Sequence, residues 1–242
     1  MIVIPMAGRS QRFFDAGYCQ PKYMLDLSGR SVFAHAVESF RGVFDRTRFL
    51  FILPEGERAA EFVRAECATL GIGDFALVSL SRPTAGQAET VELGLDGLSA
   101  PDETPLTIFN IDTFRPGFSF PGPLLDDMAG WLEVFRGEGA NWSYVRPGPG
   151  PAPLALETAE KRPISDLCCT GLYHFARSGD FRMALRAERA DPQAAELYVA
   201  PLYNHLIQAG ARIGYREISR DEVIFCGTPA EYEGLLALNA PA

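Results

Sequence analysis

The chain has 242 residues, of which 47% are apolar and 22% are charged, and a chain of this length can bury the core of one larger α/β domain. Its 22 basic and 31 acidic residues give a formal net charge of −9, which argues against a broad basic surface for nucleic acid or an anionic membrane. Any anion that the protein binds must therefore meet a local group of basic residues.

The chain contains no membrane-spanning or export signal that we recognise. No apolar run approaches the roughly 20 residues that cross a bilayer. Met1 leads directly into IVIP without a charged segment or a cleavage site. We therefore expect a cytoplasmic protein without membrane insertion. The odd number of cysteines and the absence of a C-x-x-C pair favour reduced structural thiols over disulfides or a zinc site. The cysteines are Cys19, Cys67, Cys168, Cys169 and Cys226.

Short apolar runs alternate with longer segments of helical period over the first 112 residues. This alternation is typical of a doubly wound, mainly parallel sheet flanked by helices, which is an α/β fold. Strands are expected at MIVIP (1–5), RFLFIL (48–53), FALVSL (75–80) and LTIFNI (106–111). Helices are expected at SVFAHAVESF (31–40), GERAAEFVRAECATLG (56–71) and GQAETVELGLDGL (86–98).

Proline and glycine become dense after Asp112. FRPGFSFPGP (114–123) and RPGPGPAP (146–153) are expected to be loops of the same domain. Between and after them, strands are expected at 141–147, 169–176 and 212–218. A helix is expected at ELYVAPLYNHLIQAG (196–210) despite its internal Pro201.

The first strand ends in MAGRSQRF, a glycine-containing turn. Ligands of open parallel sheets bind at the carboxyl ends of the strands. Gly8 allows a phosphate to approach the backbone, Ser10 can donate its hydroxyl, and Arg9 and Arg12 offer forked donors to phosphate oxygens. Taken alone, this segment has the alternative of a surface turn with solvated arginines.

Six further segments follow this loop in a recognisable order. They are PKYML (21–25), PTAGQAETV (83–91), IFNID (108–112), EKRPISD (160–166), TGLYHF (170–175) and GTPAEYE (227–233). The ordered set resembles the nucleotidyltransferases that join a nucleoside triphosphate to a phosphorylated sugar, choline or related alcohol. The resemblance implies a Rossmann-like, GT-A type fold and a single domain over 1–242. Residues 1–112 would form its nucleotide-binding half and residues 113–242 its acceptor-binding half.

The resemblance also implies catalytic roles. Arg12 steadies the leaving phosphates, and Lys22 bridges the α-phosphate and the attacking anion. Asp112 is the catalytic carboxylate that binds Mg²⁺. The residue types agree, because a lysine is a compact mobile charge and a carboxylate at the end of an apolar strand needs a partner such as magnesium. The alternatives are an exposed lysine and a turn capped by Asp112.

Two further groups of residues are implied to contact substrates. The nucleotide is implied to contact the loop of Ala7, Gly8, Arg9 and Ser10. Its base edge is implied to contact Gly86 and Gln87. The alternative for Gln87 is a residue in the first turn of a helix. For the acceptor, the resemblance implies Glu160, Lys161 and Gly171. The alternative for the first two is a solvated charged loop.

The chain departs from the family just before its terminal Gly-Thr-Pro. Family members supply a second metal carboxylate there, whereas this chain has Phe225 and Cys226. Asp221 or Glu222 could reach the ion from upstream, or Asp112 could hold it with the triphosphate and water alone. A third reading is a site that binds nucleotide without efficient turnover.

Three functions follow from these residues. The first is a magnesium-dependent nucleotidyltransferase that releases pyrophosphate and makes a nucleotide-activated precursor for surface polysaccharide or lipid. The second is a GT-A type glycosyltransferase, against which Arg12 and Lys22 argue because it needs no attack at an α-phosphate. The third is a catalytically weak nucleotide-binding or regulatory protein. The sequence names neither the base nor the acceptor, and exposed apolar residues in the second half would permit a homodimer.

Overall fold

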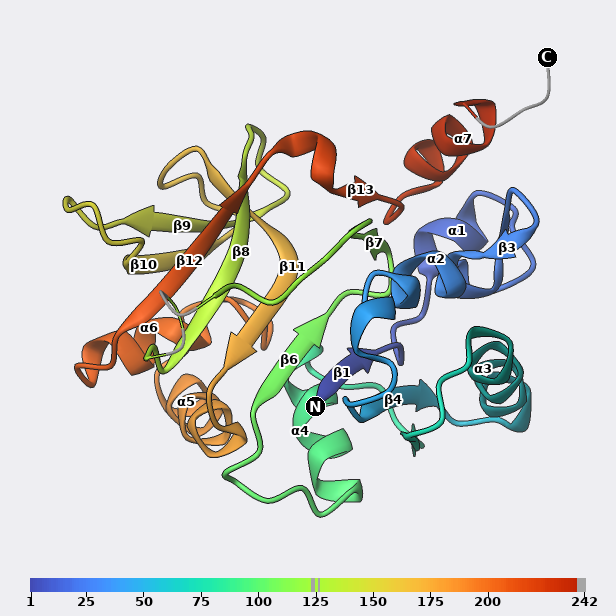
Figure 1. The fold of residues 1–242 in the computed structure, drawn as a ribbon, viewed down its shortest axis with the longest axis horizontal. Coiled ribbons are helices and arrows are strands. Elements are labelled where there is room, and N and C mark those ends of the chain that lie inside the picture. The colour runs from blue at the N-terminus through green and yellow to red at the C-terminus, as the bar shows by residue number, and fades with distance from the viewer. Residues whose placement is uncertain (123–124, 126, 239–242) are drawn as a thin grey trace.

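The computed structural model describes residues 1–122, 125 and 127–238. A sheet of nine strands runs through both halves of the chain, in the order β10-β9-β11-β6-β1-β4-β5, with β8 branching from β11 and β12 pairing with β8 (Figure 1). The predicted α/β class with a parallel sheet between helices is confirmed. Its strands are β1 (Ile2–Pro5), β4 (Phe49–Pro54), β5 (Phe75–Leu80), β6 (Leu106–Phe109), β8 (Gly130–Arg136), β9 (Ser143–Pro147), β10 (Ala155–Glu160), β11 (Leu167–Phe175) and β12 (Ile213–Ile218).

The centre of the parallel part is β1. It pairs in parallel with β4 and with β6, Ile2 lying beside Phe49 and Thr107. Ile2, Val3 and Ile4 are fully buried, as the apolar run predicts for a strand covered on both faces. Side chains alternate along β1, so Ile2 and Ile4 enter one core cluster and Val3 enters another. The predicted buried opening strand is confirmed.

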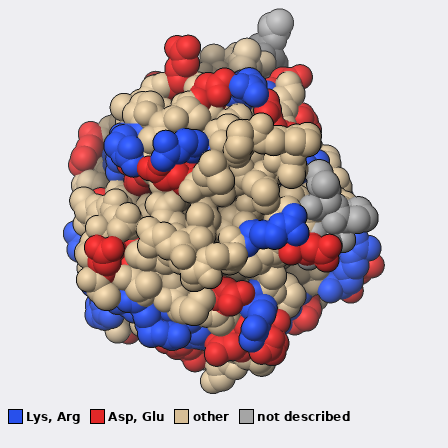
Figure 2. Space-filling model, turned by 90° about the vertical axis from the view of Figure 1, so that its left-hand side faces the viewer, with Lys and Arg blue, Asp and Glu red and all other residues tan. Residues whose placement is uncertain are grey.

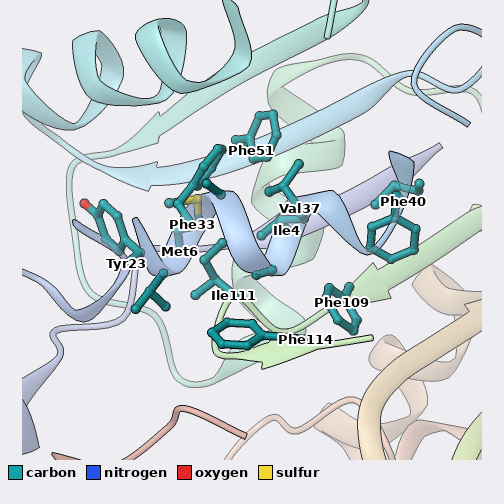
Figure 3. Close-up of a cluster of buried hydrophobic side chains, with 14 of the residues drawn as sticks. Ile4, Met6, Tyr23, Phe33, Val37, Phe40, Phe51, Phe109, Ile111 and Phe114 are labelled. Atoms are coloured by element: carbon teal, nitrogen blue, oxygen red, sulfur yellow. The ribbon is translucent and has the colours of Figure 1, made fainter. Parts of the chain in front are cut away.

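Helices cover the two faces of this sheet. One face packs against α2 and α3, whose inward side chains join an aromatic-rich core around Phe33, Phe51 and Phe109 (Figure 3). The opposite face packs against α4, α5 and α6. The helices are α1 (Gln11–Asp15), α2 (Val32–Glu38), α3 (Glu57–Leu70), α4 (Gln87–Gly97), α5 (Ser178–Ala190), α6 (Leu202–Gln208) and α7 (Pro229–Leu238).

The second half of the sheet is mostly antiparallel. The long strand β11 pairs antiparallel with β6, β8 and β9, and β10 extends the sheet beyond β9. Only β12 pairs in parallel, with β8. A bridge between Leu154 and Gly214 connects the segment before β10 to β12, so this half curls back on itself.

Short elements complete the chain and build the edge of the sheet. The strands β7 and β13 pair with each other, as do β2 and β3. These elements are η1 (Lys22–Met24), β2 (Asp26–Leu27), β3 (Arg30–Ser31), η2 (Arg41–Val43), β7 (Thr113–Phe114), η3 (Arg220–Glu222) and β13 (Ile224–Phe225).

Several predicted boundaries were wrong. The helix expected over 196–210 begins only at Leu202, because Pro201 lacks the amide that a helix interior needs and stands at the N-cap instead. The loop expected over 146–153 begins inside β9, and part of the loop expected over 114–123 is strand β7, while Pro123 lies outside the described residues. The strand β8 was not predicted, because the buried Glu133 interrupts its apolar pattern.

The surface and the thiols agree with the composition. On the face in Figure 2, acidic and basic side chains lie close together around a largely uncharged centre, without a broad basic area among the described residues. All five cysteines are free, and only Cys19 is exposed. Within the described part of the chain, no helix is long and apolar enough to cross a membrane.

Candidate active site

The loop after β1 is the segment predicted to meet the triphosphate. Ala7 to Ser10 connect β1 with α1, and the side chains of Arg9 and Arg12 are exposed. Ser10 adopts a left-handed conformation with φ 51°. Its Oγ accepts a hydrogen bond of 3.2 Å from the backbone amide of Lys22. Ser10 therefore joins this loop to the segment that carries the predicted catalytic lysine.

Lys22 and Asp112 are brought together across 90 positions of sequence. Lys22 Nζ lies 2.5 Å from Asp112 Oδ2, and the two side chains are 24% and 20% exposed. The Asp112 carbonyl accepts a hydrogen bond of 2.8 Å from the amide of Cys226. Because β1 and β6 are parallel neighbours, their carboxyl ends share one edge of the sheet. The ion pair stands at that edge and solvent can reach it.

Gln87, Asn110 and Gly171 form a second group, linked to the first through the turn after β6. Gln87 Nε2 donates to Asn110 Oδ1 at 2.6 Å, and the Asn110 amide donates to the Gly171 carbonyl at 3.1 Å. Gly171 has φ 94°, and a Cβ there would collide with the Asn110 side chain. The position therefore requires glycine for packing, and its predicted contact with the acceptor stays a prediction.

Gly86 packs against a segment from the second half of the chain. A Cβ at Gly86 would lie 2.5 Å from the Leu197 carbonyl oxygen. The Leu197 amide donates to Ala85 at 3.0 Å, and the Ala88 amide donates back to Leu197 at 2.8 Å. This close packing explains why residue 86 is a glycine, and no sequence pattern indicated it. Base recognition by Gly86 and Gln87 stays a prediction.

Glu160 and Lys161 are adjacent in sequence but differ in their surroundings. The Glu160 carboxylate accepts a hydrogen bond from the Ser143 hydroxyl, and burial raises the pKa of Glu160. Lys161 is exposed and adopts a left-handed conformation with φ 54°. Its Nζ donates to the Tyr198 hydroxyl at 2.5 Å, and this hydrogen bond raises the pKa of Lys161.

Known proteins resemble the chain in structure. A search of family models found no match, and a search of curated proteins also found none. A solved nucleoside-diphosphate-sugar pyrophosphorylase from Vibrio cholerae RC9 is 50% identical to the chain, with a TM-score of 0.93 over 98% of this chain and 100% of that one. The chain belongs to the nucleoside-diphosphate-sugar pyrophosphorylase family. The predicted family resemblance is thereby confirmed.

More distant structures share the fold of the chain. A putative glucose-1-phosphate thymidylyltransferase from Bacillus anthracis is 16% identical, with a TM-score of 0.74 over 98% of this chain and 94% of that one. The inositol-1-phosphate CTP transferase from T. maritima is 12% identical, with a TM-score of 0.71 over 98% of this chain and 95% of that one.

An aromatic side chain stands at the position where family members are expected to have a second metal carboxylate. Phe225 pairs with Thr113 across β13 and β7. Its ring centroid lies 4.7 Å from that of Trp142 and 5.4 Å from that of Phe135. The neighbouring Cys226 is fully buried, and burial raises its pKa to about 12. Magnesium takes oxygen ligands and not sulfur, so neither residue substitutes for a carboxylate.

The upstream alternatives have other partners. Glu222 Oε2 accepts a hydrogen bond of 2.8 Å from the amide of Ser219, which closes a capping box around η3. Glu222 Oε1 lies 3.9 Å from Arg115 Nη2. Asp221 is an exposed side chain on the same turn. Glu222 therefore stabilises the turn before β13 in this structure.

Asp112 is a suitable ligand for a magnesium ion whose other ligands are substrate oxygens and waters. Gly227 lies beside both Asp112 and Glu231, since a Cβ built on it would be 2.9 Å from Asp112 Oδ2 and 3.7 Å from Glu231 Oε2. The Glu231 oxygen already accepts hydrogen bonds from the amides of Gly227 and Thr228. Within the described residues, no group of three or more His, Cys, Asp or Glu side chains could hold a metal. Magnesium often binds through one or two carboxylates together with phosphates and waters, and Asp112 meets that requirement.

Three residues near the predicted site escaped the sequence analysis. Tyr198 contacts Lys161, and no periodic pattern marks it. Arg115 forms a buried pair with Glu133, which no local spacing indicates. Glu231 could have been found, because Thr228 to Glu231 has the T-x-x-E spacing of a capping box before a helix.

Proposed function

We propose that this pyrophosphorylase family member joins a nucleoside triphosphate to a phosphorylated sugar or similar phosphorylated alcohol and releases pyrophosphate. The observation that carries the proposal is the Lys22–Asp112 pair of 2.5 Å. It stands at the edge where the predicted phosphate loop leaves β1. An ammonium and a carboxylate that solvent can reach are the two charges that such a reaction requires at one place.

The reaction needs positioning and charge neutralisation more than a protein nucleophile. A phosphate oxygen of the acceptor forms a bond to the α-phosphorus, the bond from that phosphorus to the bridging oxygen breaks, and pyrophosphate leaves. Lys22 follows the oxygens at the α-phosphorus, and Arg12 meets the leaving phosphates. Because Arg12 is exposed on α1, it is available for an anion.

Asp112 would hold Mg²⁺ together with the triphosphate. When bound, the ion supplies positive charge to the phosphate oxygens. In the free protein Lys22 neutralises Asp112, and with Mg²⁺ on Asp112 the Lys22 ammonium would instead contact the triphosphate. Lys22 then becomes available to the phosphates without leaving the carboxylate uncompensated.

The acceptor binds on the side of Glu160 and Lys161 in this proposal. Lys161 meets the acceptor phosphate as a point charge. Glu160 accepts a hydrogen bond from an acceptor hydroxyl, as it does from Ser143 in the free protein. The product is a nucleotide-activated building block, which we assign to polysaccharide or lipid synthesis in the cytoplasm.

The experiment is pyrophosphate release from CTP, UTP, dTTP and GTP, each with a panel of phosphorylated sugars and alcohols, at graded Mg²⁺. We expect release with one base and one acceptor class. Sugar transfer from a ready-made nucleotide sugar would favour the glycosyltransferase. Triphosphate binding without release from any pair would favour the weak nucleotide-binding protein, the reading that Phe225 at the carboxylate position supports.

The carboxylate is tested by Asp112→Asn, which keeps the size of the side chain and removes its charge. We expect a strong increase in the Mg²⁺ concentration needed for triphosphate binding, measured by calorimetry, with an unchanged fold. Asp74→Asn is the matched control, because Asp74 is 67% exposed beside Arg48 and outside the proposed site. Unchanged ion-dependent binding in Asp112→Asn would remove Asp112 from the metal site.

A further inference from the structure

We propose that Tyr198 is a positioning residue that holds the Lys161 ammonium in place for the phosphate of the acceptor. The inference rests on the proposed function, because it assigns Lys161 to the acceptor. It adds a residue that neither the family motifs nor the sequence patterns single out.

A hydrogen bond holds the ammonium against Tyr198. Lys161 Nζ donates to the Tyr198 hydroxyl at 2.5 Å. An exposed lysine otherwise samples many rotamers, at a cost in side-chain entropy when a ligand binds. The contact with Tyr198 reduces that cost in advance.

The Tyr198 hydroxyl stays protonated. Burial raises its pKa, and Glu196 adds to that effect. A neutral hydroxyl presents its lone pairs to the Lys161 ammonium. Glu160 and Glu196 also favour the charged form of Lys161. The ammonium therefore keeps its charge, and its remaining N–H groups can meet an anion.

The main chain on either side fixes where this contact occurs. Lys161 has φ 54°, and its amide donates to the Trp142 carbonyl at 2.9 Å. Leu197, next to Tyr198, is held between Ala85 and Ala88 by two backbone hydrogen bonds. Tyr198 is therefore positioned by the loop that we predict to bind the base. Through Tyr198, the position of the acceptor lysine is set relative to the nucleotide.

The test compares Tyr198→Phe with Tyr198→Leu in initial-rate measurements of pyrophosphate release. Tyr198→Phe keeps the ring and removes the hydroxyl, so KM for the phosphorylated acceptor should rise about tenfold, while kcat and KM for the triphosphate change by less than about twofold. Tyr198→Leu also removes the same hydrogen bond, so acceptor KM should rise at least as much as in Tyr198→Phe. Tyr215→Phe is the control, since Tyr215 is a half-buried tyrosine on β12.

A double-mutant cycle with Lys161→Ala separates positioning from a general structural effect. If Tyr198 acts through Lys161, Tyr198→Phe should leave acceptor KM unchanged in the Lys161→Ala background. Equal effects in both backgrounds would overturn the inference, as would an unchanged acceptor KM in Tyr198→Phe alone. In either case the proposed function stands if the wild-type protein releases pyrophosphate. Absence of release from wild type with every pair of substrates would overturn the proposed function, and the inference with it.

Discussion

Two ion pairs lie close together on the segment that leaves β6, and they differ in almost every physical respect. Lys22 and Asp112 form the edge pair, whose side chains are 24% and 20% exposed. Arg115 and Glu133 form the buried pair, whose side chains are 1% and 0% exposed. Three positions of sequence separate Asp112 from Arg115. The same turn thus contributes one charge to the accessible edge of the sheet and another to its interior.

The difference lies in how completely each charge is satisfied. Arg115 donates to Glu133 through Nε and Nη2, at 2.7 and 3.1 Å, and to the Glu222 carbonyl through Nη1. Thr170 donates to Glu133 Oε1 at 3.2 Å. A buried network of this kind can exist only if its members are paired. The edge pair has one short contact and access to water, so its partners can be exchanged for ligand. We therefore infer a structural role for the buried pair and a chemical role for the edge pair.

The largest expected effect comes from breaking the buried pair. Arg115→Met leaves Glu133 buried without its cation, so the free energy of unfolding should fall by about 3 to 5 kcal/mol. The measurement is denaturant unfolding followed by circular dichroism. Arg177→Met is the matched control, because Arg177 and Glu103 form a pair with side chains 51% and 76% exposed, for which we expect less than about 1 kcal/mol. Equal losses in the two variants would contradict the distinction.

The second prediction concerns the edge pair. If Lys22 follows the charge that develops at the α-phosphate, Lys22→Ala should raise the barrier by about 3 to 4 kcal/mol, or roughly a hundredfold to a thousandfold in rate. Triphosphate binding and the free energy of unfolding should change much less. Lys22→Arg should restore the rate only in part, because a planar fork cannot take the position of a compact ammonium.

The measurement for Lys22 is single-turnover pyrophosphate release beside equilibrium binding of a non-hydrolysable triphosphate, for wild type and both variants. Equal losses in rate and binding would make Lys22 a ground-state anchor. An unchanged rate would exclude Lys22 from the mechanism.

The third prediction uses a titratable group inside the sheet. His174 stacks on Trp131 with ring centroids 5.3 Å apart, and burial lowers the pKa of His174 to about 4 from its ordinary 6.5. The unfolded chain therefore binds a proton between these values and the folded chain does not. The contribution of His174 to the free energy of unfolding is therefore complete above pH 6.5. It is lost as the pH falls from 6.5 through about 4.

The contribution of His174 should amount to roughly 3 kcal/mol over that pH range. Carboxylates also titrate there, so the test is the difference between wild type and His174→Asn in unfolding free energy measured from pH 7 to pH 4. Asparagine keeps a polar partner for Thr107, which lies 3.0 Å from His174 Nδ1. Parallel curves for the two proteins would show that His174 does not contribute in this way.

The sequence predicted what is local and missed what depends on distant contacts. The strand at 75–80 was predicted residue for residue, because a short, mostly apolar run between turn residues is a local signal. The strand β8 was missed because Glu133 is satisfied by Arg115 and Thr170, which lie elsewhere in the sequence. Family motifs placed Lys22 and Asp112 in one site, and the structure brings them together. No motif indicated the contact between Lys161 and Tyr198.

The smallest expected effect concerns the close packing of Gly86 against Leu197. Gly86→Ala would place a Cβ 2.5 Å from the Leu197 carbonyl oxygen and 2.7 Å from its amide nitrogen. Backbone atoms cannot move aside as a flexible side chain can, so the two segments should separate at a cost of about 1 to 3 kcal/mol. The amides of Leu197 and Ala88 should then lose protection in hydrogen exchange, while the buried Arg115 pair stays intact. Gly73→Ala is the control, because a Cβ at Gly73 meets nothing within 4 Å. Unchanged exchange at Leu197 in Gly86→Ala would mean that close packing does not explain the glycine, and would leave its φ of 154° or base recognition as the reason for it.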